Sequence, residues 1–261
     1  MPEAPLGRRL AAEGVGAFFL FATVIGSGIM AENLSGGNDA VALLANTLAT
    51  GAILFVLIAM LGPISGAHMN PAVSLVAALR RELAWRDAAA YALVQLAFGI
   101  FGAWAAHLMF DLPALQLSVK ARTGFGQWTG EAIATFGLVL TILGTVRQRP
   151  SWVPASVALY IAAAYWFTSS TSFANPAITV ARCLSDSFAG IAPADVPAFV
   201  AAQILGALLA LLAARLLFPG EPETESKPWS GQTHPCDHSS IISRGSSGIT
   251  AEARSEARPR P

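Results

Sequence analysis

The triplet Asn-Pro-Ala occurs twice in the sequence, as Asn70-Pro71-Ala72 and as Asn175-Pro176-Ala177. Asparagine is a favoured helix N-cap, because its side-chain oxygen accepts a hydrogen bond from a backbone N–H of the first turn. Proline suits the next position, where its φ is already helical and no hydrogen bond is lost. Each triplet therefore predicts the start of a helix, with the NH₂ group of the asparagine left free to point outward.

Two carboxylates and two amides lie inside long apolar segments: Glu13, Glu131, Gln95 and Gln203. An ionisable group inside a membrane segment raises the hypothesis of a proton relay. The alternative is structural, since backbone N–H groups of a loop at membrane depth need acceptors and a carboxylate supplies them. We favour the structural interpretation for Glu13 and Glu131, because they occupy equivalent places in a repeat. The two glutamines are expected to bond across helices.

The composition indicates a membrane protein. Hydrophobic residues make up 54% of the 261 residues and charged residues 12%, whereas soluble domains carry about 25% charged residues. The segments 40–79 and 150–181 contain no charged residue. Net charge is zero, so nothing favours a nucleic-acid partner. The two cysteines, Cys183 and Cys236, lie far apart and favour neither a disulfide framework nor a metal site.

Six apolar segments are long enough to cross a bilayer, which takes about 20 residues: 10–31, 40–61, 88–109, 128–146, 153–171 and 195–218. Two shorter apolar pieces, 68–79 and 173–184, each begin near one of the triplets. About ten helical residues rise only about 15 Å, half the thickness of the hydrocarbon core. Each short piece is therefore expected to enter the membrane and leave by the same face.

The chain repeats itself. Five residues recur 118 positions later, namely Glu13, Phe18, Leu20, Thr23 and Gly26 as Glu131, Phe136, Leu138, Thr141 and Gly144. Each half contains three spans, and three is odd, so the second half is expected to enter from the opposite face as an inverted repeat. Basic residues fall mainly on the side of the N-terminus, which predicts that both termini are cytoplasmic. Residues 219–261 read as a disordered cytoplasmic tail.

Two helix starts that meet at the midplane would have an electrostatic consequence. Each start carries about half a positive charge, so a cation or hydronium between them is repelled. A neutral solute with an oxygen atom can instead accept hydrogen bonds from Asn70 and Asn175. This arrangement favours small neutral polar solutes and opposes ions.

The segments 64–73 and 172–177 resemble the two signature loops of the aquaporin and glycerol-facilitator family, the major intrinsic proteins. The segments around the two glutamates and the two glutamines fit the same family. The resemblance covers residues 8–218, as a first repeat of about 8–110 and a second of about 128–218. It implies an all-α integral membrane fold with six transmembrane helices and two re-entrant half-helices. It also implies a homotetramer in the plasma membrane, with a pore in each subunit and no cofactor.

Members of the family have an outer constriction of four residues above the second triplet. Counting from the triplets, the resemblance assigns it to Thr50, Ala163, Ser172 and Ile178. Most of the family places an arginine where this chain has Ile178. Without that arginine, and with three small side chains, the opening is expected to be wide and to lack a fixed cation. Arg182, one helical turn further on, could be a displaced filter arginine. We favour the alternative that it lies at the outer surface or anchors an outer loop.

The sequence thus predicts a passive channel for small uncharged solutes and not an enzyme. The filter favours uncharged hydroxides of arsenic and antimony, as in an arsenic-associated bacterial branch that the sequence resembles, with glycerol, urea or water as alternatives. A proton-coupled transporter and an ion channel are the more distant alternatives. His68 is expected either to line the inner vestibule or to pack within its loop. The tail residues His234, Cys236 and His238 could hold a soft metal, but coincidence is favoured.

Overall fold

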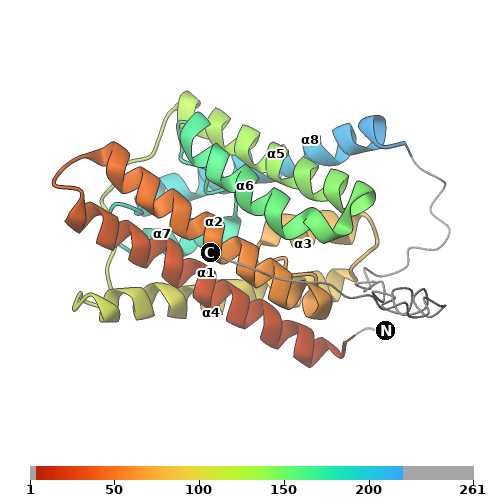
Figure 1. Cartoon of the computed structure of the whole chain (residues 1–261), viewed down its shortest axis with the longest axis horizontal. Coiled ribbons are helices and arrows are strands. Elements are labelled where there is room, and N and C mark those ends of the chain that lie inside the picture. Colours follow the sequence, from red (N-terminus) through yellow and green to blue (C-terminus); the bar gives the residue numbers. More distant parts are fainter. Residues whose placement is uncertain (1–3, 220–261) are drawn as a thin grey trace, which may run out of the picture. The chain divides into compact units, whose positions relative to one another are not determined.

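The computed structural model of the protein describes residues 4–219. The remainder of the expected tail, with His234, Cys236 and His238, lies outside the described residues. The described part is built from helices and connecting loops, without a strand. In chain order its helices are α1 Leu6–Leu34, α2 Asp39–Ser65, α3 Pro71–Leu79, α4 Trp85–Met109, α5 Phe125–Gln148, the short 3-10 helix η1 Pro150–Trp152, α6 Val153–Phe167, α7 Pro176–Cys183, the 3-10 helix η2 Pro193–Asp195 and α8 Val196–Leu217 (Figure 1).

Each expected span corresponds to one long helix, and the all-α membrane architecture is confirmed. Among residues 4–219, five helices are long and apolar enough to cross a membrane. The remaining one, α6, has 15 residues and ends at Phe167, four residues before the expected end. It ends there because Thr168 leaves the helical region with a φ of −104° and a ψ of 138°. The chain then turns back into the protein toward the second triplet.

The two short helices begin at the triplets, as the capping pattern predicts. The Asn70 side chain accepts a hydrogen bond from Ala72 N at 2.9 Å. Asn175 accepts from Ala177 N at 3.0 Å and from Ile178 N at 3.3 Å. The proline that follows each asparagine occupies the first turn of its helix. With 9 and 8 residues, α3 and α7 reach about halfway through a bilayer.

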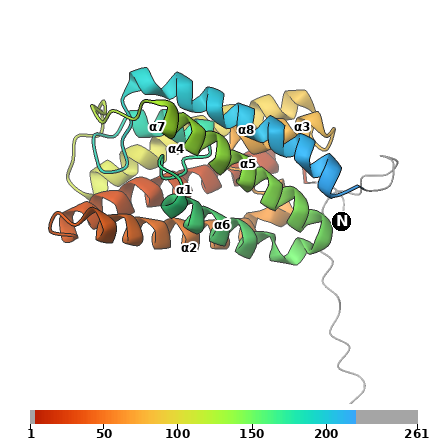
Figure 2. The same ribbon diagram turned by 90° about the horizontal axis from the view of Figure 1, so that it is seen from above.

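The helix contacts follow the inverted repeat. In the first half α1 packs against α2 and α4, and in the second half α5 packs against α6 and α8. Helices α2 and α6 meet each other, and so do α3 and α7. Each half-helix also packs against the last long helix of the other half, α3 on α8 and α7 on α4. Figures 1 and 2 show the two half-helices placed among the long ones.

Glycines allow the paired helices to approach at the backbone. A Cβ atom at Gly102 of α4 would collide with the carbonyl oxygen of Phe18 in α1. A Cβ atom at Gly206 of α8 would collide in the same way with the carbonyl oxygen of Ala132 in α5. Small residues at such crossings are typical of helix packing in membranes, where close van der Waals contact drives association. The first crossing positions α1 and the second positions α5, the helices that carry the two buried glutamates.

The surface of the helices is strongly apolar. Leu93, Leu159 and Leu216 are 71%, 68% and 81% exposed, and many other large apolar side chains are exposed beside them. Monomeric soluble proteins rarely expose contiguous apolar surface on this scale. Together with the five long apolar helices, this surface is suited to contact with lipid.

Candidate functional site

The two half-helices meet through their own caps. The Asn70 amide nitrogen donates to the carbonyl oxygen of Ala174 at 2.8 Å, and the Asn175 amide nitrogen donates to the carbonyl oxygen of Met69 at 2.8 Å. The expectation of wholly free amides is therefore corrected, because one N–H of each amide joins the opposite loop. The second N–H of each amide has no partner in the described part of the chain and can serve a solute.

The loops before the two helices share an unusual backbone conformation. Met69 and Ala174, directly before the capping asparagines, have φ angles of 47° and 48°. Ala67 and Ser172, two residues earlier, have φ angles of 49° and 50°. The left-handed region is uncommon for residues with a side chain, and such residues persist only where the surroundings fix them. Here a buried glutamate fixes each loop, Glu13 the first and Glu131 the second.

Glu13 holds the first loop. Its carboxylate accepts hydrogen bonds from His68 N at 2.9 Å and Met69 N at 2.6 Å. It also accepts from Ser65 Oγ at 2.7 Å and Gln95 Nε2 at 2.8 Å. The side chain is fully buried. These bonds agree with the structural interpretation of this glutamate and leave no unused lone pair aimed at a solute path.

Glu131 holds the second loop by the same arrangement. Its carboxylate accepts from Phe173 N at 2.8 Å and Ala174 N at 2.9 Å. Gln203 Nε2 donates to it at 2.6 Å and also to Thr179 Oγ1 at 2.8 Å. As in the first half, a carboxylate from the first helix and a glutamine from the last helix meet over the re-entrant loop. The glutamines therefore bond across helices, as expected from the sequence.

His68 packs within its loop. Its Nδ1 lies 3.1 Å from Ser74 Oγ, and its ring meets that of Tyr91 edge-on with centroids 5.4 Å apart. The side chain is half-buried. Of the two expectations for this histidine, the structure favours loop packing.

The structure places three of the four expected filter residues in the interior. Thr50, Ser172 and Ile178 are all buried, and Ile178 belongs to the central apolar cluster. The Oγ of Ser172 is enclosed and has no hydrogen-bond partner in the described residues. Buried hydroxyls are normally paired, so this group is available to a solute or a water molecule.

The structure does not bring the fourth expected residue, Ala163, together with the other three. Ala163 is exposed on the face of α6 that also carries Leu159 and Trp166, at one-turn spacing. Tyr165 is buried on the opposite face, and its hydroxyl lies 3.2 Å from Thr50 Oγ1. Counting back from the triplet assumed the loop length of other family members. The apolar spacing of Val157, Ile161 and Tyr165 would have identified the inward face of this helix.

Arg182 lies inside the protein and not at its surface. It is 2% exposed, and its Nε donates to the carbonyl oxygen of Ala189. Its guanidinium carbon lies 3.3 Å from the centroid of the Phe173 ring. The expectation that it anchors an outer loop is thus met, and the surface alternative is wrong. A second buried arginine, Arg122, was not singled out from the sequence because it lies in a connecting segment without a motif.

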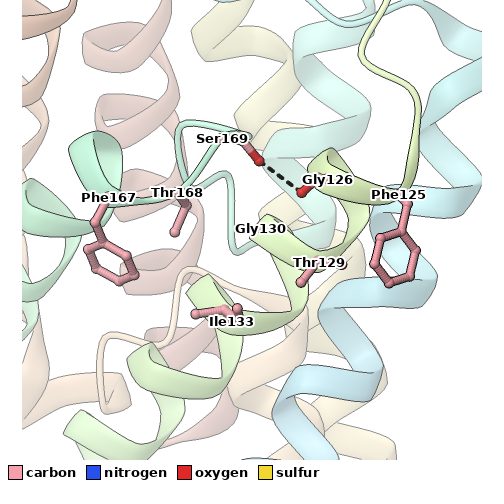
Figure 3. Close-up of a pocket in the computed structure, with 8 residues that line it drawn as sticks. All are labelled: Phe125, Gly126, Thr129, Gly130, Ile133, Phe167, Thr168 and Ser169. Atoms are coloured by element: carbon pink, nitrogen blue, oxygen red, sulfur yellow. Dashed lines mark hydrogen bonds between the residues drawn. The ribbon is translucent and has the colours of Figure 1, made fainter.

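A separate groove of about 320 Å³ lies between the start of α5 and the end of α6. Figure 3 shows its apolar walls, formed by Phe125, Ile133 and Phe167. Ser169 Oγ donates to the carbonyl oxygen of Gly126 at 2.8 Å and so ties the loop after α6 to α5. None of its lining residues belongs to the triplets or to the outer ring, so this groove is distinct from the candidate solute path.

Comparisons with known proteins agree with this geometry. Residues 2–173 match the family model described as Major intrinsic protein. Aquaglyceroporin AqpS of Rhizobium meliloti is 56% identical over 223 residues, which are 85% of this chain and 95% of that protein. Aquaporin AqpM of Methanothermobacter thermautotrophicus is 30% identical, over 79% of this chain and 96% of that protein.

A solved structure shares the fold. The aquaglyceroporin from Plasmodium falciparum superposes with a TM-score of 0.65 at 19% sequence identity, and the match covers 82% of this chain and 98% of that one. The family match spans more than half of the chain, and the described helices have the architecture expected for it. The chain therefore belongs to the major intrinsic protein family, and it is a multi-pass membrane channel that passes small solutes passively and not an enzyme.

Proposed function

We propose that this channel conducts small neutral polyhydroxylated solutes, with arsenous and antimonous acid as the preferred class. The observation that carries the proposal is the makeup of the outer ring. Ile178 stands directly after the second triplet, and the ring around it supplies the hydroxyls of Thr50, Tyr165 and Ser172. An apolar wall facing several hydroxyls suits a solute that carries hydroxyl groups around a compact centre.

We place Tyr165, and not Ala163, at the fourth position of the ring, because its hydroxyl contacts Thr50. This assignment changes the expected width of the opening. The ring contains one aromatic side chain and is narrower than three small residues would make it. It remains free of a charged side chain, which would bind water tightly and fill the opening. Glycerol and urea are the alternative solutes, and they need the same apolar and hydroxyl surfaces. The name of the Rhizobium relative, an aquaglyceroporin, supports a solute larger than water.

The test is solute uptake by liposomes containing the full chain. Vesicles mixed with an excess of arsenous acid, glycerol or sucrose first shrink, and re-swelling then reports entry of the solute. We expect fast re-swelling with arsenous acid and glycerol, and none with sucrose or in empty vesicles. Shrinkage that is faster than in empty vesicles, without re-swelling for any solute, would identify a water pore and refute the proposal.

A pair of variants at one position sharpens the test. Ile178→Arg introduces a long cationic side chain into the ring and is expected to slow arsenous acid and glycerol at least about tenfold, since a displaced or narrowed path raises the barrier by more than about 1.4 kcal/mol. Ile178→Val keeps the position apolar and small, so its uptake is expected to stay within about twofold of the wild type. Equal uptake by all three proteins would mean that residue 178 does not face the solutes.

We also propose a homotetramer in the plasma membrane with both termini in the cytoplasm. The excess of basic residues on the side of the N-terminus supports the orientation, and the exposed apolar helix faces support contact with lipid or further subunits. The two cysteines test the orientation, since Cys183 is the last residue of the second half-helix and Cys236 comes after the last helix in the sequence. An impermeant maleimide is expected to label Cys236 in inside-out vesicles but not in right-side-out vesicles. The opposite labelling would refute the orientation, and native mass spectrometry tests the tetramer.

A further inference from the structure

Two arginines lie buried beside the outer ring. Arg182 is 2% exposed and Arg122 is 8% exposed. Both guanidiniums lie over the ring of Phe173, with the guanidinium carbons 3.3 and 5.0 Å from its centroid. Phe173 directly follows Ser172 of the ring in the sequence.

Neither arginine forms an ion pair in the part of the chain that the structure describes. Within residues 4–219, the guanidinium of Arg122 donates only to carbonyl oxygens, those of Gly190 at 2.7 Å, Ser170 at 3.3 Å and Phe188 at 3.4 Å. Arg182 donates to the carbonyl oxygen of Ala189. A buried charge without a counter-ion is costly, and its field extends further than that of a neutralised pair.

The carboxylates nearby are engaged elsewhere. Asp195 accepts from the backbone N–H of Arg122 at 2.7 Å, and Glu32 accepts from Phe188 N at 3.0 Å. Glu131, the buried carboxylate of this region, accepts from Phe173 N and Ala174 N. Among the buried side chains of this region, the two guanidiniums outnumber the single carboxylate, Glu131.

The terminal nitrogens of Arg182 distinguish it from a purely structural arginine. They donate to no group within residues 4–219, and they are not among the fully enclosed unpartnered atoms of the protein. They therefore reach accessible space although the side chain as a whole is buried. On α7 this accessible space lies one turn beyond Ile178, at the outer side of the ring.

The inverted repeat shows that a half-helix of this kind can form without an arginine at this position. Arg182 stands seven residues after Asn175, and the matching position seven residues after Asn70 is Ala77. The inner half-helix, α3, thus has a small apolar residue, Ala77, at the position where the outer half-helix has a cation. The charge is an addition to the outer half.

We infer that Arg182, with Arg122 behind it, supplies the cation-repelling charge of the outer constriction in place of the residue directly after the second triplet. The neutral ring then sets the size and chemistry of the solute, while the two arginines outside it exclude cations and hydronium. Burial lowers the pKa of Arg122, in the loop before α5, to about 10, so this guanidinium stays charged at neutral pH. The inference rests on the proposed passage of neutral solutes, and its test measures that passage separately.

The test compares ion leak with solute uptake in the same vesicles. Proton flux is followed with an enclosed pH dye under a potassium diffusion potential, and glycerol uptake by re-swelling. Wild-type vesicles are expected to take up glycerol with a proton flux no greater than that of empty vesicles. Arg182→Met is expected to raise proton flux about tenfold or more, as removal of about one unit charge near a low-dielectric path implies, while glycerol uptake changes less than about twofold.

Matched variants separate charge from packing. Arg182→Gln keeps a donor for Ala189 without the charge and is expected to leak like Arg182→Met. Arg182→Lys keeps the charge, and its proton flux is expected to stay at the wild-type level. The double variant Ile178→Arg with Arg182→Gln is expected to be tight again, because a cation returns to the constriction. Restored tightness with slow glycerol uptake fits the inference equally well, since the introduced arginine narrows the ring.

Three results would overturn the inference. One is a tight Arg182→Gln channel that still takes up solute or water at the wild-type rate. Another is a leaky Arg182→Lys channel, which would mean that packing and not charge matters. A third needs no variant, namely a wild-type channel that passes protons freely. Absence of glycerol or arsenous acid uptake by the wild type, with water permeability retained, would refute only the proposed solutes, because leak can then be compared with water flux.

Discussion

The substitution Glu131→Gln tests the central structural element of the pore at the level of single hydrogen bonds. The change preserves the shape of the side chain and removes its charge. One carboxylate oxygen accepts from Phe173 N at 2.8 Å, and the other accepts from Ala174 N at 2.9 Å and from Gln203 Nε2 at 2.6 Å. An amide retains a single acceptor oxygen, so its NH₂ group must face a backbone N–H.

The cost follows from this count. If the amide oxygen stays with Phe173, the N–H of Ala174 loses its acceptor. Losing a hydrogen bond to a charged group costs about 1.5–3 kcal/mol, and a buried donor without a partner adds about 1–3 kcal/mol. Gln203 can turn its amide to accept from the new NH₂ group, but it then loses its 2.8 Å bond to Thr179. The expected destabilisation is about 3–5 kcal/mol, which for a chain of this size lowers the unfolding temperature by roughly 6–20 °C.

The measurement is the unfolding temperature of the detergent-solubilised channel, followed by size-exclusion chromatography after heating. Glu32→Gln is the matched control, because Glu32 is exposed and accepts one bond, from Phe188 N at 3.0 Å. Its effect is expected to stay within about 0.5 kcal/mol. An unfolding temperature of Glu131→Gln within 2 °C of the wild type, about 1 kcal/mol or less by the same conversion, would refute the reasoning. It would mean that the second loop does not depend on the second acceptor oxygen of Glu131.

Two further predictions concern helix packing and the ring. Gly206→Val is expected to destabilise the protein by at least about 1–3 kcal/mol, because a Cβ atom there collides with the carbonyl oxygen of Ala132. Gly126→Val is expected to be nearly neutral in the same heating assay, because a Cβ atom there meets Ser169 Oγ at an ordinary contact distance of 3.9 Å. Equal losses for both variants would refute the close crossing. Tyr165→Ala is expected to speed the uptake of polyols larger than glycerol, as measured by re-swelling, whereas Ala163→Leu is expected to leave uptake within about twofold of the wild type. A large effect of Ala163→Leu with none of Tyr165→Ala would assign the filter position to Ala163.

The parts of the site that depend on local chemistry could be predicted from the sequence. An asparagine followed by proline specifies a helix start whatever surrounds it, so the origins of α3 and α7 follow from the triplets alone. The role of Glu13 follows from the need of a loop at membrane depth for acceptors. These predictions use rules that apply within a few residues.

The parts that depend on the length of a loop or the end of a helix could not be predicted. Assigning Ala163 required the loop between α6 and α7 to have a known length. The face of α6 that points inward depends on how the helix packs, and Tyr165 lies on that buried face. Arg182 was expected at the surface or at a loop because charge normally seeks water. Its burial depends on contacts with the ring of Phe173 and the carbonyl oxygen of Ala189. No sequence pattern indicates that these two groups meet Arg182.

The paired amide bonds at the midplane have a consequence for how this molecule can change. Asn70 on Ala174 and Asn175 on Met69 are one contact made twice in opposite directions. Such a contact is isologous, the kind that joins two identical subunits about a twofold axis. One polypeptide thus holds a junction that two copies of a half-length chain could form between them. Fusion of the halves frees their outer ends to diverge, so Ile178 and Arg182 on one side can differ from Val73 and Ala77 on the other while the midplane stays the same.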